Sequence, residues 1–401
     1  MKKSTLFLWM LLAWLGITAR AQDSAKCSLL TCSAGEEIYS LFGHTALRYE
    51  DPARGIDVVF NYGMFSFRVP HFALRFALGE TDYQLGVTEF SRFAAEYQWD
   101  ERDVWQQTLN LTSREKQRLW EALTENYRPE NRTYRYNFFY DNCATRPRDR
   151  IEACVDGRVE YAAAQDTTAM VCTWRDLLHR YTEGHPWARF GIDLCIGSRA
   201  DKPASYREQM FVPFYLQQYL RGACIVSEQG DRRPLVGEEV KVVDAAHTAQ
   251  EESLLPSPMQ AALLLWAGVT VLSIYGVRRR KSLWALDGLL FGTAGVAGCI
   301  LAFLAACSQH PAVSPNWLLL VLHPLHLFCL PCVLIRVKKK RLSRYMAANG
   351  VVLTLFIVLL APIPQFIPPA VLPLTLCLLV RCASNWMLAR KTVANQPVKQ
   401  E

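Results

Sequence analysis

Residues 259–281 have the sequence MQAALLLWAGVTVLSIYGVRRRK, an apolar run that ends in four consecutive cations. Its length matches the ~20 residues that a helix needs to cross the hydrocarbon core of a bilayer. The chain behind this run stays apolar, whereas the chain ahead of it is rich in charged residues. The run therefore divides the 401 residues into an extramembrane part and a membrane part.

Four further apolar segments follow, at 283–307, 317–335, 351–361 and 371–388. Clusters of Lys and Arg come directly after the first, third and fifth segments, and such clusters stay in the cytoplasm. We therefore predict about five transmembrane helices over 258–391, with the extramembrane part outside and a cytoplasmic tail at 392–401. Because prolines crowd the junction of the last two segments, a re-entrant pair is the alternative there.

The charges are divided unevenly between the two parts. Residues 256–401 hold 14 Lys and Arg against two Asp and Glu, whereas residues 22–255 hold 27 against 35. A protein surface that binds nucleic acid needs an excess of cations to meet the phosphates. Since the extramembrane part is acidic, we expect no nucleic acid among the partners.

The N-terminus has the pattern of a secretory signal peptide. Lys2 and Lys3 precede an apolar run over 6–17, and the small-residue motif ARA follows at 19–21. We predict that residues 1–21 are a cleaved signal; an uncleaved anchor is the alternative. In both cases the domain at 22–225 lies outside the cytoplasm, and the polar stretch 226–257 is predicted to link it to the first span.

The extramembrane part mixes helix and strand signals, which predicts an α+β domain. Thr112-Ser113-Arg114-Glu115 is a capping box that opens a helix to about residue 127. Aromatic residues at every second position of 134–140 indicate an extended segment packed on one face. The remaining patterns predict helices at 36–42, 69–77, 91–99 and from about 145 to 154, and strands at 44–50, 57–62 and 104–111.

Seven cysteines lie between the signal and the first span: Cys27, Cys32, Cys143, Cys154, Cys172, Cys195 and Cys224. A compartment outside the cytoplasm favours disulfides, and an odd number leaves at least one thiol unpaired or paired between chains. We expect six structural cysteines and one reactive one. No C-x-x-C motif occurs there and no metal-ligand cluster stands out, so we expect no metal and no cofactor.

Cys143 is the best candidate for a reactive thiol. Asn142 is a good helix N-cap, which predicts Cys143 in a first helical turn, where free N–H groups and the helix dipole lower a thiol pKa. The same N–H groups could hold an oxyanion during acyl transfer. Asp141, Arg146 and Tyr49 are candidate supporting residues. The alternative is a structural cysteine at a helix start.

A cysteine nucleophile also needs a base, and His44 begins a predicted strand. If the turn at 51–56 closes a hairpin in which residue 49 faces residue 57, His44 faces residue 61 or 62. Asn61 could then hold the imidazole as the third member of a Cys-His-Asn set. His71, His179 and His185 are the competing candidates for the base.

The membrane part offers further polar candidates. Ser308, His310 and Asn316 are expected at its outer surface, where they could face a lipid headgroup. His323 and His326 lie within the third apolar segment, and ionisable residues inside a membrane are functional candidates. The alternative for both histidines is a structural hydrogen bond to a neighbouring helix.

Three motifs of the extramembrane part resemble the Lnb family of lipoprotein N-acyltransferases: LFGHTALR at 41–48, FNYG at 60–63 and FFYDNCATR at 138–146. The membrane part resembles the same family through DGLLF at 287–291, SQHP at 308–311 and the stretch 316–325. The resemblance covers most of the chain and excludes only its start and the stretch 226–255.

The resemblance implies a circularly permuted papain-like domain, of the NlpC/P60 kind, followed by an α-helical membrane bundle. It implies Cys143 as nucleophile, His44 as base and Asn61 as orienting residue. The implied reaction moves an acyl chain from a membrane phospholipid, through a cysteine thioester, to the N-terminal amine of a diacylglyceryl-cysteine lipoprotein. The implied location is the inner membrane of a bacterium, as a multi-pass protein with its catalytic domain in the periplasm.

Two other functions remain open at this stage. A membrane-tethered cysteine peptidase or amidase acting on cell-wall peptide would use the same three residues, although it would need less membrane than five spans. A membrane scaffold or sensor without catalysis would use all seven cysteines structurally.

Overall fold

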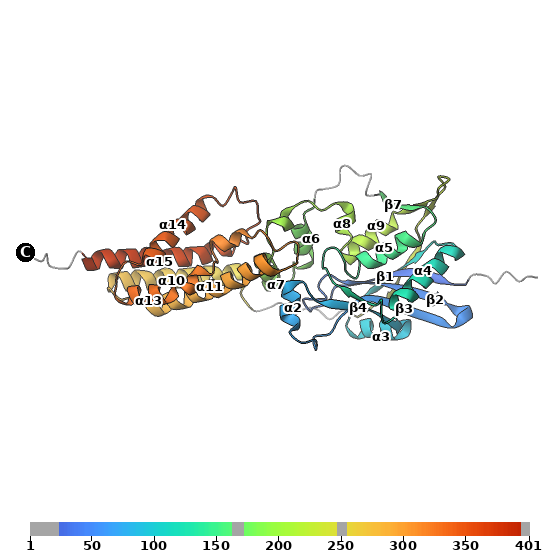
Figure 1. The fold of residues 1–401 in the computed structure, drawn as a ribbon, viewed down its shortest axis with the longest axis horizontal. Coiled ribbons are helices and arrows are strands. Elements are labelled where there is room, and N and C mark those ends of the chain that lie inside the picture. The colour runs from blue at the N-terminus through green and yellow to red at the C-terminus, as the bar shows by residue number, and fades with distance from the viewer. Residues whose placement is uncertain (1–23, 163–171, 247–254, 394–401) are drawn as a thin grey trace, which may run out of the picture.

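The computed structural model describes residues 24–162, 172–246 and 255–393. A domain built on a β-sheet and a bundle of membrane helices lie end to end (Figure 1). The predicted signal peptide 1–21 and most of the predicted tail 392–401 lie outside the described residues.

Seven antiparallel strands form the main sheet of the N-terminal domain, in the order β10-β5-β1-β2-β3-β4-β6. The strands are β1 (Lys26–Cys32), β2 (His44–Asp51), β3 (Ile56–Met64), β4 (Asp82–Glu89), β5 (Val104–Leu109), β6 (Thr133–Arg135) and β10 (Val236–Val243). Strand β10 comes from the stretch predicted as a linker. That part of the prediction is wrong, because residues 236–243 pair with β5 despite two irregularities in the ladder that interrupt any period-two pattern.

The hairpin β2–β3 forms as predicted, but its register is shifted by one residue. Tyr49 pairs with Val58 instead of residue 57, and the ladder ends where Leu47 pairs with Phe60. The cause is the short 3₁₀ turn η1 (Pro52–Arg54), which Gly55 closes in the left-handed conformation. Beyond Leu47 the two strands separate, and this opening faces the segment around Cys143.

Helices cover both faces of the sheet. They are α3 (Phe90–Trp99), α4 (Ser113–Tyr127), α5 (Thr145–Cys154) and α9 (Pro213–Arg221), whereas α2 (Phe72–Leu78) buries none of its residues. The largest core cluster lies between the sheet and helices α4, α5 and α9, and a smaller one lies under α3. The predicted capping box at Thr112 is present, with Glu115 bonding back to the Thr112 N–H.

Two sequence predictions in this domain are wrong. Residues 36–42 form turns instead of a helix. The aromatic segment 134–140 is extended only to Arg135, because Asn137 then caps a turn by accepting hydrogen bonds from the N–H groups of Phe139 and Tyr140.

A second, smaller layer lies between this core and the membrane part. It contains helices α6 (Trp174–Tyr181), α7 (Pro186–Cys195) and α8 (Tyr206–Gln209), the 3₁₀ turn η3 (Ser198–Asp201), and the small sheet of β7 (Arg158–Glu160), β8 (Cys224–Val226) and β9 (Arg232–Pro234). Its helices share an apolar cluster with Leu41, Phe42 and Phe139, which flank the predicted catalytic segments. The layer therefore connects those segments to the membrane bundle.

The membrane part contains α10 (Pro258–Arg278), α11 (Trp284–Cys307), η4 (Trp317–Leu320), α12 (Leu325–Phe328), α13 (Leu330–Lys338), α14 (Arg344–Val358) and α15 (Val371–Val393). By length and composition, α10, α11 and α15 can each cross a membrane, and the bent pair over 317–338 could be a fourth span. Three or four of the described helices therefore meet this test, and the predicted number of about five spans is not confirmed by it. The third segment bends by 73° at the break between Phe328 and Leu330, and the prolines after residue 361 leave α14 with only 15 residues.

A buried ion pair holds three of these helices together. Arg381 on α15 donates to both carboxylate oxygens of Asp287 on α11, at 2.7 and 3.1 Å, and to Ser273 on α10 at 2.9 Å. Asp287 is fully buried in the bundle. The pair satisfies two charges that hydrocarbon could not solvate.

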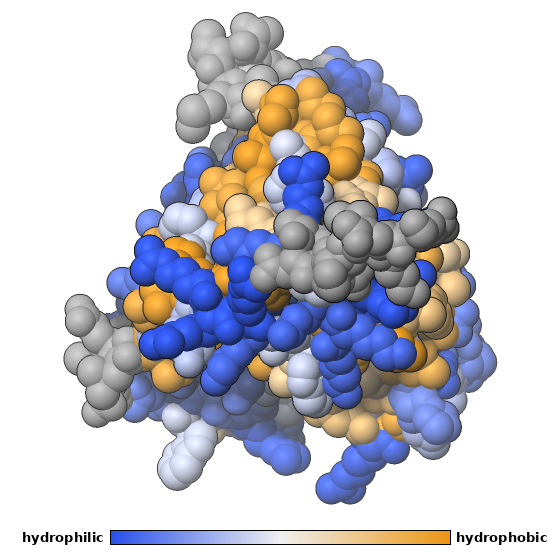
Figure 2. All heavy atoms as spheres, turned by 90° about the vertical axis from the view of Figure 1, so that its left-hand side faces the viewer, coloured by the Kyte–Doolittle hydropathy of each residue, from blue (hydrophilic) through white to orange (hydrophobic). Residues whose placement is uncertain are grey.

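The exposed basic residues gather at the end of the bundle that points away from the sheet. Figure 2 views this end and shows hydrophilic residues grouped there beside hydrophobic ones. Hydrogen bonds connect the chain segments at this end. The Ser282 hydroxyl after α10 donates to the Val337 carbonyl of α13, and the Asn385 amide of α15 donates to the Arg341 carbonyl. All three predicted basic clusters therefore lie on one side of the bundle, the side where α15 ends.

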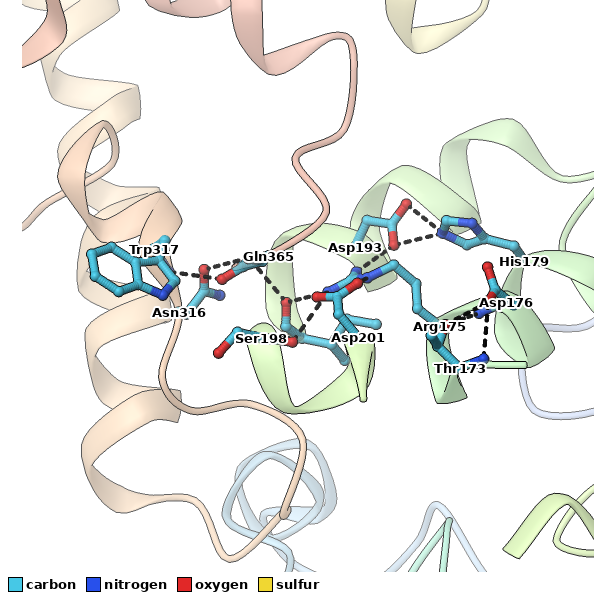
Figure 3. A network of polar contacts seen from close by, with 12 residues as sticks. Thr173, Arg175, Asp176, His179, Asp193, Ser198, Asp201, Asn316, Trp317 and Gln365 are labelled. Carbon is cyan, nitrogen blue, oxygen red and sulfur yellow. Dashed lines mark hydrogen bonds and ion pairs between the residues drawn. The ribbon is translucent and has the colours of Figure 1, made fainter. Parts of the chain in front are cut away.

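Polar contacts join the membrane part to the N-terminal domain (Figure 3). Asn316 donates to the carbonyl of Leu194 at the end of α7, at 2.8 Å, and accepts from Gln365 at 3.2 Å. Gln365 comes from the loop before α15, and its own carbonyl accepts from the Trp317 N–H. Two loops of the membrane part therefore bond to the same corner of the N-terminal domain, the C-terminal end of α7.

That corner is itself tightly held. Arg175 of α6 is buried and bonds to Asp193 of α7 and Asp201 of η3, both at 2.7 Å (Figure 3). His179 lies 2.8 Å from the same Asp193 carboxylate. The helices that contact the membrane loops are therefore tied to one another.

Candidate functional site

Cys143 lies in the turn directly before α5, at the open end of the β2–β3 hairpin. Its sulfur accepts a hydrogen bond from the backbone N–H of Thr45, the residue that follows His44. Gly63 of β3 lies on the other side, where an added Cβ would be 3.5 Å from the Cys143 Cβ. All thirteen cysteines are free thiols, so the predicted six structural disulfide partners do not pair. Cys27 and Cys32, for example, point to opposite faces of β1, into different core clusters.

His44 and Asn61 meet within this opening. The Nε2 atom of His44 lies 3.2 Å from Oδ1 of Asn61. Because an amide oxygen can only accept, Nε2 carries the proton and Nδ1 is left as the basic nitrogen. Extended beyond Leu47, the observed register puts His44 opposite residue 63, so Asn61 is its diagonal neighbour on the same face of the sheet.

Gly43 fixes the position of His44. Its φ of +76° is left-handed, and a Cβ there would lie 2.6 Å from the carbonyl oxygen of Cys32. Only glycine allows the chain to turn this closely into β2. The close contact with Cys32 therefore explains why glycine stands between Phe42 and His44 in the motif.

Both reactive groups are neutral at physiological pH. Burial raises the pKa of Cys143 to about 11, although the N–H groups of Thr45 and Cys143 itself oppose the rise. Burial lowers the pKa of His44 to about 4; the hydrogen bond to Asn61 opposes this and the charge of Arg102 adds to it. The prediction that the helix start lowers the thiol pKa is wrong, because burial outweighs the backbone donors.

Asn142 explains part of this result. The side-chain oxygen of Asn142 accepts from the N–H groups of Ala144 and Thr145, at 2.8 and 3.0 Å. Because α5 begins at Thr145 with Ala144 as its N-cap, the prediction that Asn142 is the N-cap and Cys143 lies in the first helical turn is wrong. Those two N–H groups are thereby occupied and cannot hold an oxyanion. The donors that remain beside the sulfur belong to Thr45 and Cys143.

Comparison with known families gives two matches. A model described as the Lnb N-terminal periplasmic domain matches residues 17–180, and a model described as the Lnb transmembrane domain matches residues 249–392. The chain belongs to the Lnb family. Its N-terminal domain is therefore periplasmic, and the family indicates a membrane enzyme of lipoprotein maturation. No curated protein and no solved structure matched in the other two comparisons.

The candidate supporting residues of this Lnb-family chain divide into two groups. Arg146 holds the Asp141 carboxylate with two hydrogen bonds, at 2.6 and 2.8 Å, and stacks over the ring of Tyr134. This pair braces the turn that carries Cys143. Tyr49 lies at the far end of β2 from His44, where its ring packs against Trp120 in the core. The structure therefore places Tyr49 outside the site.

Of the competing histidines, only His179 has side-chain partners among the interactions of the described residues. His71 and His185 precede helices α2 and α7. The ring of His179 lies between Asp193 and Arg189, at 2.8 Å from each. Among the described residues, the histidine whose neighbour contacts the sulfur is His44.

The outer-surface candidates of the membrane part contact protein. Asn316 is buried in the junction described above. His310 lies 2.7 Å from the carbonyl of Phe76 on α2, and the Ser308 hydroxyl accepts from the His310 N–H. The expectation that these three residues face a lipid headgroup is therefore wrong for Asn316, and the other two hold the junction as well.

His323 and His326 stack on each other, with their ring centres 3.9 Å apart. His323 lies 3.3 Å from Asn349, and His326 lies 2.8 Å from the Tyr345 hydroxyl and 2.9 Å from the Val321 carbonyl. These contacts favour the structural alternative for His326. They join the broken third segment to α14.

Two features of the site carry no sequence signal. The Thr45 N–H acts through its backbone, so no residue type marks it. Arg102 lies at the end of the loop before β5, bonds to the Ser33 carbonyl, and lowers the pKa of both His44 and Cys143 through space.

Proposed function

We propose that this chain is a lipoprotein N-acyltransferase with Cys143 as its nucleophile. It would take an acyl chain from a membrane phospholipid and transfer it to the N-terminal amine of a diacylglyceryl-cysteine lipoprotein. The observation that carries the proposal is the arrangement of one free thiol against the strand of His44, with that histidine oriented by Asn61. Membership of the Lnb family supports it.

The order of these residues supports a circularly permuted papain-like fold. The histidine and asparagine come from neighbouring strands, and the cysteine precedes a helix that packs against the sheet. His44 and Asn61 stand before Cys143 in the chain. The chemistry depends on this convergence and not on the order along the chain.

The first half-reaction forms a thioester. As the sulfur of Cys143 attacks the ester carbonyl, the thiol proton passes to Nδ1 of His44, and a C–S bond forms. The tetrahedral oxyanion would be held by the N–H groups of Thr45 and Cys143. The ester C–O bond then breaks, and the proton on His44 passes to the oxygen of the departing lysophospholipid.

The second half-reaction uses the lipoprotein. Its N-terminal amine attacks the thioester carbonyl, an amide C–N bond forms and the C–S bond breaks. His44 takes the amine proton and returns it to the sulfur of Cys143, which restores the enzyme. The neutral resting pair suits this cycle, because no charged group must be desolvated before the attack.

The proposed setting is the inner membrane of a bacterium. The basic residues gathered at one end of the bundle favour that end in the cytoplasm. The catalytic domain is then periplasmic and the C-terminus cytoplasmic. Both substrates are anchored in the outer leaflet, so they meet the enzyme by diffusion in two dimensions.

Mass spectrometry of lipoprotein N-termini in cells that lack N-acylation tests the proposal. Expression of the chain is expected to add one acyl chain to the N-terminal cysteine of lipoproteins. Cys143→Ala and His44→Ala are expected to abolish the added mass, whereas Cys154→Ala, a buried free thiol elsewhere, should retain it. Cleavage of cell-wall peptide without acylation would favour a peptidase instead, and full acylation by Cys143→Ala would refute the mechanism.

A further inference from the structure

An exposed apolar surface borders the catalytic site. It consists of Ile38, Tyr39, Met64, Phe67, Val69, Leu74 and Phe76, and we call it the mouth surface. Ile38 is 65% exposed and Phe67 is 64% exposed. Its two segments lie shortly before His44 and shortly after Asn61 in the chain. A monomeric protein in water rarely exposes so many large apolar side chains together.

Helix α2 gives the clearest sign that this surface does not face water. Its sequence is FALRFAL, and none of its residues is buried. A short surface helix in a water-soluble domain normally buries an apolar stripe and exposes polar residues. Here the apolar residues are the exposed ones, as in helices that lie in a membrane interface.

Aromatic rings connect the mouth surface from end to end. The ring of Tyr39 lies 6.0 Å from Phe67, and Phe67 lies 5.0 Å from Phe72 at the start of α2. Phe72 stacks on Phe76 at 6.2 Å, and Phe76 lies 5.6 Å from His310 of the membrane part. The surface is therefore continuous from the loop before His44 to the membrane bundle.

A branch of the same row leads inward to the nucleophile. Phe65 lies 5.0 Å from Tyr83, which stacks on Tyr136 at 4.0 Å. Tyr136 is close enough to Cys143 for the thiol to raise its pKa, after burial. Gly63, directly before Met64, lies against the Cys143 side chain. A row of packed aromatic rings thus connects the exposed surface to the surroundings of the sulfur.

The mouth surface lies where the chain leaves the membrane. Helix α11 ends at Cys307, and two residues later the Gln309 N–H donates to the Leu78 carbonyl at 2.9 Å. His310 contacts the Phe76 carbonyl, as described above. The end of a membrane helix marks the level of the bilayer surface, so α2 lies at that level.

We propose that the mouth surface enters the outer leaflet of the bilayer and receives one long acyl chain of the donor lipid, which it leads to Cys143. This inference rests on the proposed function and adds to it the surface through which the donor lipid reaches the site. The continuity of the surface with the membrane bundle identifies the occupant as lipid. Arg68, an exposed cation within the same segment, is suited to a lipid phosphate.

The first test compares two donors with full-length protein in phospholipid nanodiscs. One donor is the long-chain phospholipid of the disc, and the other is a short-chain, water-soluble nitrophenyl ester. Phe67→Asp and Leu74→Asp are expected to lower the ratio of long-chain to short-chain turnover about tenfold, because a charge replaces apolar contact with the chain. An unchanged ratio in both variants would overturn the inference.

Two matched variants control this test. Phe67→Leu keeps the position apolar and should keep the ratio within about twofold of the original. Val240→Asp places the same charge on an exposed position of β10, at the opposite edge of the sheet, and should leave the ratio unchanged. A fall of the ratio in Val240→Asp equal to that in Phe67→Asp would contradict a role specific to the mouth surface.

The second test does not depend on activity. A photo-crosslinking amino acid is placed at position 67, or at 240 as control, in the Cys143→Ala variant in nanodiscs. We expect a lipid-mass adduct at position 67 and none at 240. No adduct at 67, or only a crosslink to an added lipoprotein polypeptide, would overturn the inference even if the enzyme is active. Conversely, a lipid adduct at position 67 together with an unsubstituted enzyme that adds no acyl chain to lipoproteins would refute the proposed function and leave the membrane-entering surface supported.

Discussion

At the scale of single residues, the account rests on three side chains whose grouping could be predicted and whose charge states could not. The motifs around His44, Asn61 and Cys143 indicated their roles, and the predicted hairpin brings His44 and Asn61 together, although in a register one residue from the predicted one. The neutral thiol follows from burial, which a sequence does not display. The two backbone donors beside the sulfur are equally invisible in residue types.

The low pKa of His44 predicts an unusual pH dependence. The imidazole must be unprotonated to accept the thiol proton, and it is unprotonated above a pKa of about 4. The acid limb of kcat/KM for a soluble ester should therefore lie near pH 4 to 5, below the ordinary histidine value near 6.5. A pH–rate profile measures this. A limb at 6.5 or higher would show that His44 is not buried as described, or is not the base.

Asn61 should act on the reaction through His44. Asn61→Ala leaves Nε2 without its acceptor, so we expect kcat to fall about 10- to 100-fold as the ring loses its orientation. Asn61→Asp keeps an acceptor but adds a negative charge, which favours the imidazolium. Its acid limb should move to higher pH. If neither kcat nor the limb changes in these variants, Asn61 has no orienting role.

At the scale of elements, the sequence predicted those helices and strands whose determining residues lie within the element itself. The capping box at Thr112 and the helix it opens were predicted almost to the residue. Strand β10 was missed because its pattern is weak and its partner β5 lies far away in sequence. The segment 36–42 looked helical, but it must turn to bring Gly43 against Cys32.

The turn before α5 should depend on one buried amide. Besides its two accepted bonds, Asn142 donates to the carbonyls of Phe138 and Phe211, both at 2.8 Å. Asn142→Ala leaves four buried groups unsatisfied, and we expect a loss of about 2–4 kcal/mol of stability. Thermal unfolding of the full chain in detergent measures it. Asn131→Ala, at an exposed loop position, should shift the midpoint little; equal shifts would contradict the role of Asn142.

At the scale of the whole molecule, the sequence indicated two parts and their order, but not how they meet. Gln365, Asn316 and the α7–η3 corner come from three distant stretches, and nothing local marks their contact. Hydropathy also does not show that the third apolar segment bends by 73° between Phe328 and Leu330.

The bundle should depend on the pair of Asp287 and Arg381. Asp287→Ala leaves a buried guanidinium without its partner, and we expect it to cost about 3–5 kcal/mol. The double variant Asp287→Leu with Arg381→Met removes both charges and should recover most of the loss. The yield of monodisperse protein on size-exclusion chromatography reports both effects. Thr293→Ala, on the exposed side of α11, is the control. A double variant no better than Asp287→Ala would contradict this assignment.

The central claim is that Cys143 carries the acyl chain, and one measurement tests it directly. The purified full-length chain is incubated with phospholipid and no lipoprotein acceptor, and the intact protein and its peptides are weighed. The account predicts one added acyl mass on the peptide that contains Cys143, which hydroxylamine removes and which is absent in His44→Ala. Acyl mass on another residue, or an unmodified Cys143 in protein that still acylates lipoproteins, would contradict it.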